Sequence, residues 1–114
     1  METKLNPDGL ALFVKRACPT CTLIEQQIRQ VARARPDLQV VVQDDPRFPA
    51  GVANIVDDTA LDHSYVHRIE AVPTLIRFSG GREAERVVGW DRAAWRRLSG
   101  IADLGEELPV FRPG

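Results

Sequence analysis

An apolar run followed directly by two cysteines and a helix signal is the feature that most constrains this chain. The run LALFVKR (10–16) is nearly continuous and is typical of a strand buried on both faces. It leads into CPTC, where Cys18 and Cys21 are the only cysteines of the sequence. Pro19 suits the first position of a helix, because that position needs no backbone N–H donor. The sequence therefore predicts a buried strand that places Cys18 at a helix N-terminus.

The residues after the cysteines predict a helix and a second strand. The helical pattern runs from Pro19 until Pro36 ends it. A strand at 38–45 follows, and because it comes after a full helix we expect a parallel, right-handed βαβ unit. The segment VANIV (52–56) also has strand character, so the sheet uses Val40 to Val42, Val52 to Val56, or both. The apolar residues at helical spacing in the first helix are Ile24, Ile28 and Val31.

The second half of the sequence predicts a helix, a hairpin and a closing helix. The hairpin spans 74–90 and turns at Gly80-Gly81, where a positive φ costs nothing. The closing helix spans 91–104, with Asp91 as its N-cap. The expected fold class is therefore α/β, with a mixed sheet of four strands, or five if VANIV joins it, flanked by helices. The middle helix spans 57–69, and its expected inner face is Leu61, Tyr65, Val66 and Ile69.

Length and charge limit the domain organisation and the partners. With 114 residues, 44% of them hydrophobic, we expect a single domain over 1–114 that buries about two-thirds of its unfolded surface, with tails at 1–8 and 105–114. The net charge is −1 and the basic residues are scattered among acids. No one-signed field is therefore expected for nucleic acid or an anionic membrane surface.

The N-terminal sequence bears on the compartment and hence on the cysteines. Its apolar run is short and broken by charge, so we expect neither a signal peptide nor a membrane span. The default compartment is the cytoplasm. In that reducing setting, two cysteines are more typical of catalysis or metal binding than of a structural disulfide.

Three motifs, taken in order, resemble the thioredoxin family over residues 8 to 104. They are the C-x-x-C pair at a helix start, EAVPTLIRF at the opening of the hairpin, and VVGW before the last helix. The resemblance implies a thioredoxin fold and thiol–disulfide exchange, with Cys18 as the attacking thiol and Cys21 as the resolving thiol. It implies no prosthetic cofactor. The implied partners are protein or small-molecule disulfides and an electron donor, either a reductase or glutathione, with the protein working as a monomer.

The resemblance also implies a substrate groove beside the cysteines. Pro73 corresponds to a cis-proline, flanked by Val72 and Thr74, and Gly89 to a glycine beside the site. A proline has no N–H to compete for a passing peptide, so the backbone at Val72 is free to pair with a substrate strand. Trp90 is expected either to give this surface a broad apolar ring, or to be a core residue that seats the last helix or an exposed aromatic ahead of Asp91, while Trp95 sits inside the last helix.

Several residues near the cysteines are candidates for supporting roles. The N–H groups of a helix N-terminus stabilise a thiolate at Cys18, and Lys15 and Arg16 add positive potential. Pro19 and Thr20 fill the positions between the cysteines, where the Pro-first order is closer to glutaredoxins. Thioredoxins carry a buried acid in the first strand, but this chain has Leu12 there. Glu25, four residues beyond Cys21, is the candidate proton acceptor in its place.

The segment from Pro46 to Asp58 is longer than the family's usual connection. A loop that leaves the C-terminal end of a strand lies at the edge of the sheet where the site is expected. The segment therefore either rims the substrate groove or makes a surface excursion with a small strand of its own.

Two other classes of function remain open. Cys18, Cys21, His63 and His67 have ligand types and spacings found in zinc sites. About forty residues separate the two pairs, against about a dozen in a zinc finger, and both histidines are expected to point to solvent, so we expect no metal. The other class is a non-catalytic thioredoxin-like module that binds peptides, although such modules have usually lost a cysteine.

Overall fold

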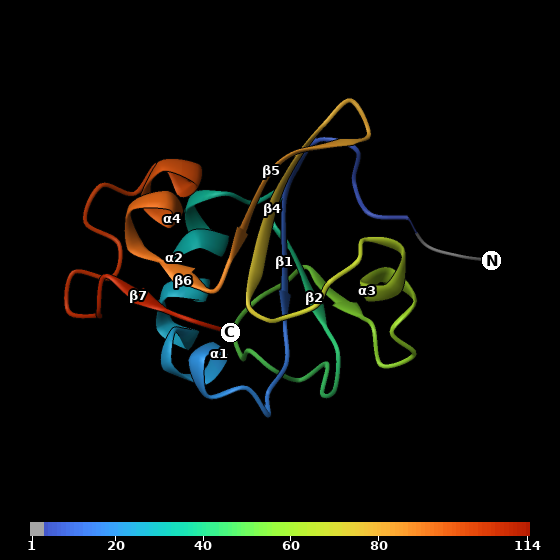
Figure 1. Cartoon of the computed structure of the whole chain (residues 1–114), viewed down its shortest axis with the longest axis horizontal. Coiled ribbons are helices and arrows are strands. Elements are labelled where there is room, and N and C mark those ends of the chain that lie inside the picture. The colour runs from blue at the N-terminus through green and yellow to red at the C-terminus, as the bar shows by residue number, and fades with distance from the viewer. Residues whose placement is uncertain (1–3) are drawn as a thin grey trace.

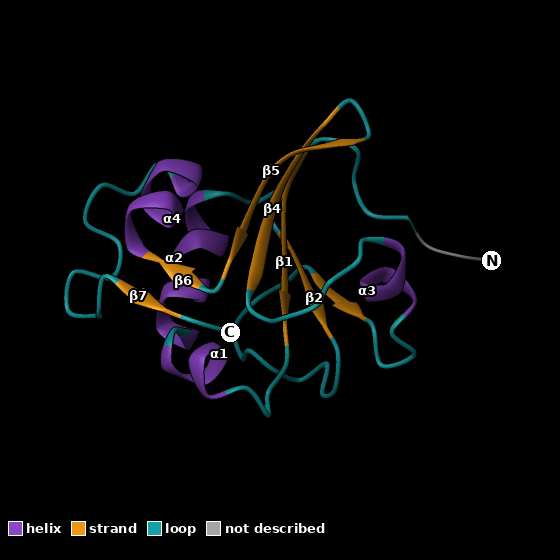
Figure 2. Ribbon diagram, viewed as in Figure 1, coloured by secondary structure: helices purple, strands orange, loops and turns teal. Residues whose placement is uncertain are grey.

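The structure is a computed structural model that describes residues 4–114 (Figure 1). A five-stranded mixed sheet lies at its centre, and a separate two-stranded ribbon lies beside it (Figure 2). The elements in chain order are β1 (Gly9–Val14), α1 (Pro19–Leu23), α2 (Glu25–Ala34), β2 (Gln39–Val42), β3 (Ile55–Asp57), α3 (Asp62–Val66), β4 (Thr74–Ser79), β5 (Arg82–Val88), β6 (Trp90–Asp91), α4 (Arg92–Ser99) and β7 (Phe111–Arg112).

The apolar run before the cysteines forms the central strand. The strand order is β3-β2-β1-β4-β5, with β1 parallel to β2 and antiparallel to β4. Every residue of β1 from Leu10 to Val14 is buried, because helices cover both faces of the sheet. In Figure 1, α1, α2 and α4 lie on one side of β1 and α3 lies on the other. The α/β class and the mixed sheet are as expected.

The fifth strand comes from the middle of the chain. Both candidate runs enter the sheet, since β2 pairs with β1 and β3 pairs in parallel with β2, Val41 opposite Val56. Only the end of VANIV takes part, and the strand continues to Asp57. The sequence left the choice between these runs open, and the structure uses both.

The helix predicted after the cysteines is divided into α1 and α2. The break lies at Ile24, where φ is −98° and ψ is 14°. Hydrogen bonds run across it, because Ile24 N donates to Thr20 O at 3.1 Å and Ile28 N donates to Ile24 O at 2.9 Å. Ile24, Ile28 and Val31 are fully buried, as their spacing predicted.

The predicted inner face of the middle helix is wrong except at Ile69, which is partly buried against the core. The helix is only Asp62–Val66, and Tyr65, expected inside, is 86% exposed, while Leu61 and Val66 are exposed as well. The buried residue is Ser64, whose N–H and hydroxyl both donate to the buried carboxylate of Asp58, at 3.0 and 2.6 Å. These two hydrogen bonds hold Ser64 on the side of α3 that faces the sheet. Its apolar neighbours Tyr65 and Val66 therefore face solvent.

The hairpin and the last helix follow the sequence more closely. β4 and β5 are joined at Gly80-Gly81, with φ of 60° and 79°. The Asp91 carboxylate accepts a hydrogen bond from Ala94 N at 3.2 Å and so caps α4, which ends at Ser99 and is shorter than the predicted 91–104.

Both expected tails contact the body of the protein where they are described. Asn6 N donates to the Gln39 side chain at 2.7 Å, and Pro7 O accepts from Gly81 N at 2.9 Å. At the other end, β7 pairs with β6. Residues 1–3 of the expected N-terminal tail lie outside the described residues. Within 4–114, each helix is too short or too polar to cross a membrane.

Candidate active site

Cys18 is the N-cap residue of α1, and its sulfur lies between two backbone groups. Cys21 N donates to Cys18 Sγ at 3.1 Å, and the Cys18 thiol donates to Val72 O at 3.4 Å. An N–H aimed at the sulfur stabilises a thiolate there. Both cysteines are free thiols, and Cys18 is only 4% exposed.

Cys21 occupies a different environment although it lies only one helical turn away. It is fully buried, and this burial raises its pKa far above the ordinary value, with a further rise from its hydrogen bond with the Cys18 thiol. The backbone N–H and the charge of Lys15 act in the opposite direction but are outweighed. Cys21 is therefore a protonated thiol at neutral pH.

The turn before Cys18 is held by an aspartate that sequence reasoning missed. The Asp44 carboxylate accepts from Arg16 N at 2.7 Å and from Ala17 N at 2.9 Å. Partial burial raises the pKa of Asp44, but these N–H donors, with that of Asp45, outweigh burial and lower it. The only sequence signal was the position of Asp44 after a strand parallel to β1.

The charged candidates near Cys18 have other partners. The Arg16 guanidinium donates to the Asp45 carboxylate at 2.8 Å. The Glu25 carboxylate forms a partly exposed ion pair with Arg29 at 3.3 Å, and its role as proton acceptor for Cys21 stays a prediction. The Lys15 carbonyl accepts a hydrogen bond from Cys18 N at 3.3 Å, and the charge of Lys15 acts to lower the pKa of Cys21.

The predicted groove residues meet beside Cys18. The Val72-Pro73 peptide bond is cis, Thr74 Oγ1 donates to Ala71 O at 2.6 Å, and Pro73 O accepts from Gly89 N at 2.7 Å. Gly89 has a φ of 81°, which a side chain would disfavour. Val72 O also accepts a hydrogen bond from the Cys18 thiol, so the start of β4 and the end of β5 lie against the cysteine pair.

Trp90 does not contribute to this surface, so the prediction that it does is wrong and the alternative of a core position is confirmed. Its side chain is fully buried, with its ring centroid 5.1 Å from that of Trp95. Its Nε1 donates to Pro109 O at 2.8 Å, and Trp95 Nε1 donates to Gly89 O at 3.1 Å. The hydrogen-bond acceptor of the Trp90 indole lies in the C-terminal segment, and no local sequence pattern indicated this contact.

Pro19 and Thr20 lie between the cysteines. Pro19 takes the first position of α1, as predicted from its missing N–H. Thr20 is buried, and its hydroxyl donates to Pro113 O at 2.7 Å. The end of the chain therefore reaches the cysteine pair.

The long segment 46–58 contains a strand and also lines a hollow beside α1. Its second part is β3, whereas Phe48 is buried and Ala50 O accepts from Arg29 at 3.4 Å. Phe48 and Ala50 share a hollow of about 500 Å³ with Arg16 and Thr22, which flank Cys18 in sequence. The first part of the segment thus lies beside the start of the cysteine-bearing helix.

Solved structures of known proteins resemble this arrangement. Oxidized mitochondrial thioredoxin 3 of Saccharomyces cerevisiae is 20% identical, with a TM-score of 0.58 over 87% of this chain and 80% of its own. The DsbF protein of MTB, in its mixed oxidized and reduced forms, is 18% identical, with a TM-score of 0.67 over 84% of this chain and 81% of its own. Thioredoxin of Trypanosoma brucei brucei is 21% identical, with a TM-score of 0.58 over 82% of this chain and 74% of its own.

The protein has a thioredoxin fold. At these identities the likeness establishes the fold alone. Comparison of the sequence with models of known families and with curated proteins finds no match. Within the thioredoxin fold, the cysteine pair begins the helix that follows the central strand, where the sequence placed it.

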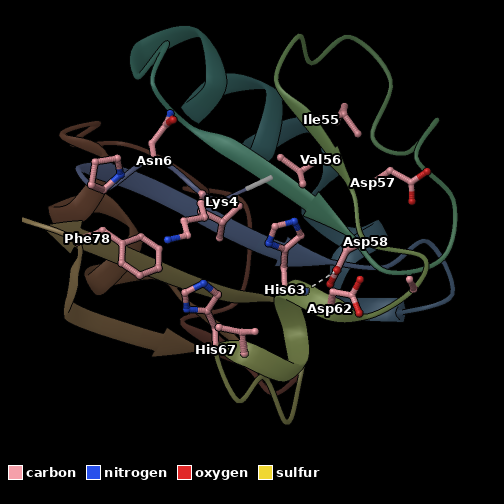
Figure 3. Close-up of a pocket in the computed structure, with 15 residues that line it drawn as sticks. Lys4, Asn6, Ile55, Val56, Asp57, Asp58, Asp62, His63, His67 and Phe78 are labelled. Carbon is pink, nitrogen blue, oxygen red and sulfur yellow. Dashed lines mark hydrogen bonds between the residues drawn. The ribbon is translucent and has the colours of Figure 1, made fainter. Parts of the chain in front are cut away.

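The two histidines lie on the far side of this sheet, around a cavity of about 1060 Å³ beside α3 (Figure 3). The centroid of the His67 ring lies 5.9 Å from that of the Phe13 ring and 5.2 Å from that of the Phe78 ring. Burial lowers its pKa, helped by the charges of His63 and Arg86. The expectation that His67 points to solvent is therefore wrong. Within residues 4–114, the Cys, His, Asp and Glu side chains form no group of three or more suited to a metal ion.

Proposed function

We propose that this protein catalyses thiol–disulfide exchange through Cys18 and Cys21, reducing disulfides of proteins or small molecules. The single observation that carries the proposal is the difference between the two thiols. Cys18 Sγ receives an N–H from Cys21, whereas burial holds Cys21 protonated. Thiol–disulfide exchange needs this difference when one cysteine attacks the substrate disulfide and the other resolves the mixed disulfide.

The reaction proceeds in two displacements. The Cys18 thiolate attacks one sulfur of the substrate disulfide, and the other substrate sulfur leaves as a thiolate and takes up a proton. Cys21 then loses its proton and attacks Cys18 Sγ, which releases the second substrate sulfur as a thiolate. Two electrons have passed to the substrate, and Cys18 and Cys21 are left joined as a disulfide.

The raised pKa of Cys21 gives the order of these steps. While Cys18 is free, Cys21 is protonated and its N–H supports the thiolate beside it. Once Cys18 is bonded to substrate, its thiol no longer raises the pKa of Cys21 through their hydrogen bond. Deprotonation of Cys21 then becomes easier at the stage at which it must attack.

The partners follow from the same chemistry. The oxidised pair needs an electron donor, a reductase or glutathione, and no prosthetic cofactor takes part. Reduction suits the cytoplasm, where thiols are kept reduced. We propose that the protein works there as a monomer, carrying electrons from the donor to protein or small-molecule disulfides.

Trapping of the mixed disulfide tests the division of roles. Reduced Cys21→Ser, incubated with insulin, should accumulate a covalent adduct at Cys18, because no second thiol can resolve it. Cys18→Ser should trap none, because the remaining thiol is buried and protonated. The adducts are measured on non-reducing gels and by mass spectrometry, with circular dichroism to check that each variant is folded.

The alternative functions give different results. Equal trapping by both variants would contradict the assignment of Cys18 as the attacking thiol. Absence of any adduct, with binding of a disulfide-free peptide retained, would instead favour a non-catalytic peptide-binding module.

A further inference from the structure

The last residues of the described chain lie in the groove where a substrate would bind. They follow α4, pass along β6 as β7, and end between α1 and the start of β4 (Figure 1). We call Phe111–Gly114 the terminal strap. The sequence predicted only a tail at 105–114 here.

The part of the chain before the strap is firmly anchored. Arg92 Nη1 donates to Leu108 O at 3.0 Å, and Arg92 N donates to Val110 O at 3.0 Å. Between them, Pro109 O accepts from the buried Trp90 indole at 2.8 Å. These bonds direct the strap towards the cysteines.

The strap itself contacts three predicted groove or supporting residues. A Cβ built on Gly89 would lie 2.7 Å from Arg112 O, so the absence of a side chain there permits the approach. Pro113 O accepts from Thr20 Oγ1 at 2.7 Å. Gly114 lies so close to the Val72 backbone that a Cβ on it would collide with the Val72 carbonyl.

Cys18 and Gly114 therefore share one neighbour. The Cys18 thiol donates to Val72 O, the oxygen that a Gly114 side chain would strike, and Cys18 is 4% exposed. A disulfide of a folded protein must bring a sulfur and its flanking backbone to the same place. The strap and such a substrate cannot occupy it together.

We propose that the terminal strap occupies the peptide groove in place of substrate, and that a protein disulfide reaches Cys18 only when the strap end moves away. This inference rests on the proposed function. The strap also indicates the substrate that fits: an extended segment with a small residue facing Val72. Among residues 4–114, Thr20 is the one side chain with a hydrogen bond to Pro113 or Gly114, so these two residues can move away while the anchored part stays.

The first test compares Gly114→Val with Val110→Ala. A valine at 114 collides with the Val72 carbonyl and should expel the strap end, whereas Val110 is 64% exposed and its backbone bond is kept. Iodoacetamide should alkylate Cys18 roughly tenfold faster in Gly114→Val than in wild type, because reaction scales with the uncovered fraction. Val110→Ala should match wild type. Insulin reduction should rise in parallel.

The two readouts separate this inference from the proposed function. Alkylation and insulin reduction that are both unchanged in Gly114→Val would overturn the strap and leave the proposed function standing. Faster alkylation with no insulin reduction by any variant would overturn the proposed function and, with it, the competition between strap and substrate.

A deletion gives a second test that does not depend on a steric clash. Removal of Pro113 and Gly114 takes away the residues that contact Thr20 and Val72 and keeps the residues of β7, which pair with β6. Iodoacetamide should again alkylate Cys18 roughly tenfold faster than in wild type, because the groove is uncovered. An alkylation rate equal to that of wild type would overturn the proposal.

Discussion

Asp44 shows how a single side chain fixes the position of the attacking thiol. Its carboxylate binds the N–H groups of the two residues before Cys18, which join β1 to α1. Without these bonds both donors would have to be satisfied by water, and the turn would gain freedom. Asp44 is exposed and touches neither cysteine in the bonds that it makes, so its role is positional.

Asp44→Asn should lower the free energy of unfolding by about 1 kcal/mol, because Arg16 N and Ala17 N donate to different carboxylate oxygens and an amide has only one acceptor oxygen. The comparison is made by urea unfolding at neutral pH, with Glu106→Gln as the matched exposed variant. Glu106→Gln should change stability by less than about 0.5 kcal/mol. A loss no greater in Asp44→Asn than in this control would contradict the role given to Asp44.

The same variant has a defined pH dependence. The folded pKa of Asp44 lies below its unfolded value of about 3.9, so the carboxylate stabilises the fold above that pH. Its contribution is lost as the pH falls through the folded pKa. The stability difference between wild type and Asp44→Asn should therefore be constant near neutrality and vanish in strong acid.

At the scale of elements, β6, β7 and α4 form one unit around the two tryptophans. Trp90 and Trp95 pack in the core with their ring planes tilted by 56°, and their indole N–H groups donate to Pro109 O and Gly89 O, respectively. Trp90 thus binds the C-terminal segment, and Trp95 binds Gly89 in the groove. The unit links the last helix to both sides of the cysteine site.

Trp90→Ala should destabilise the fold by about 3–5 kcal/mol, because it leaves a cavity against Trp95 and an unpaired carbonyl at Pro109. Tyr65→Ala is the matched aromatic control, since Tyr65 is 86% exposed, and it should cost less than about 0.5 kcal/mol. Thermal and urea unfolding measure both. Similar losses in the two variants would show that Trp90 is not the core residue described.

At the scale of the whole molecule, the sequence predicted what local patterns determine. The continuous apolar run gave the central strand, Pro19 gave the start of α1, and the Gly80-Gly81 pair gave the hairpin turn. Each signal lies within a few residues of the structure that it specifies. The position of Cys18 at the start of the helix after the central strand was therefore predicted correctly, whereas its catalytic role stays a prediction.

Most of the errors concern contacts between segments that are distant in the sequence. The inward face of α3 is the exception, because Ser64 bonds to Asp58 only six residues before it. The burial of Trp90 depends on Pro109, nineteen residues away. Asp44 lies 27 residues from Ala17. Such partners meet only after the sheet has brought their strands together, so periodicity and propensity carry no sign of them.

Equilibration with glutathione tests the central claim most directly, because it asks whether Cys18 and Cys21 form one reversible two-electron couple. The account predicts a single intramolecular disulfide whose fraction follows the glutathione ratio, with a potential between about −270 and −120 mV. Cys21→Ser should give only a Cys18–glutathione adduct under the same conditions. A wild-type protein that forms glutathione adducts at every ratio, and never the Cys18–Cys21 disulfide, would contradict the account.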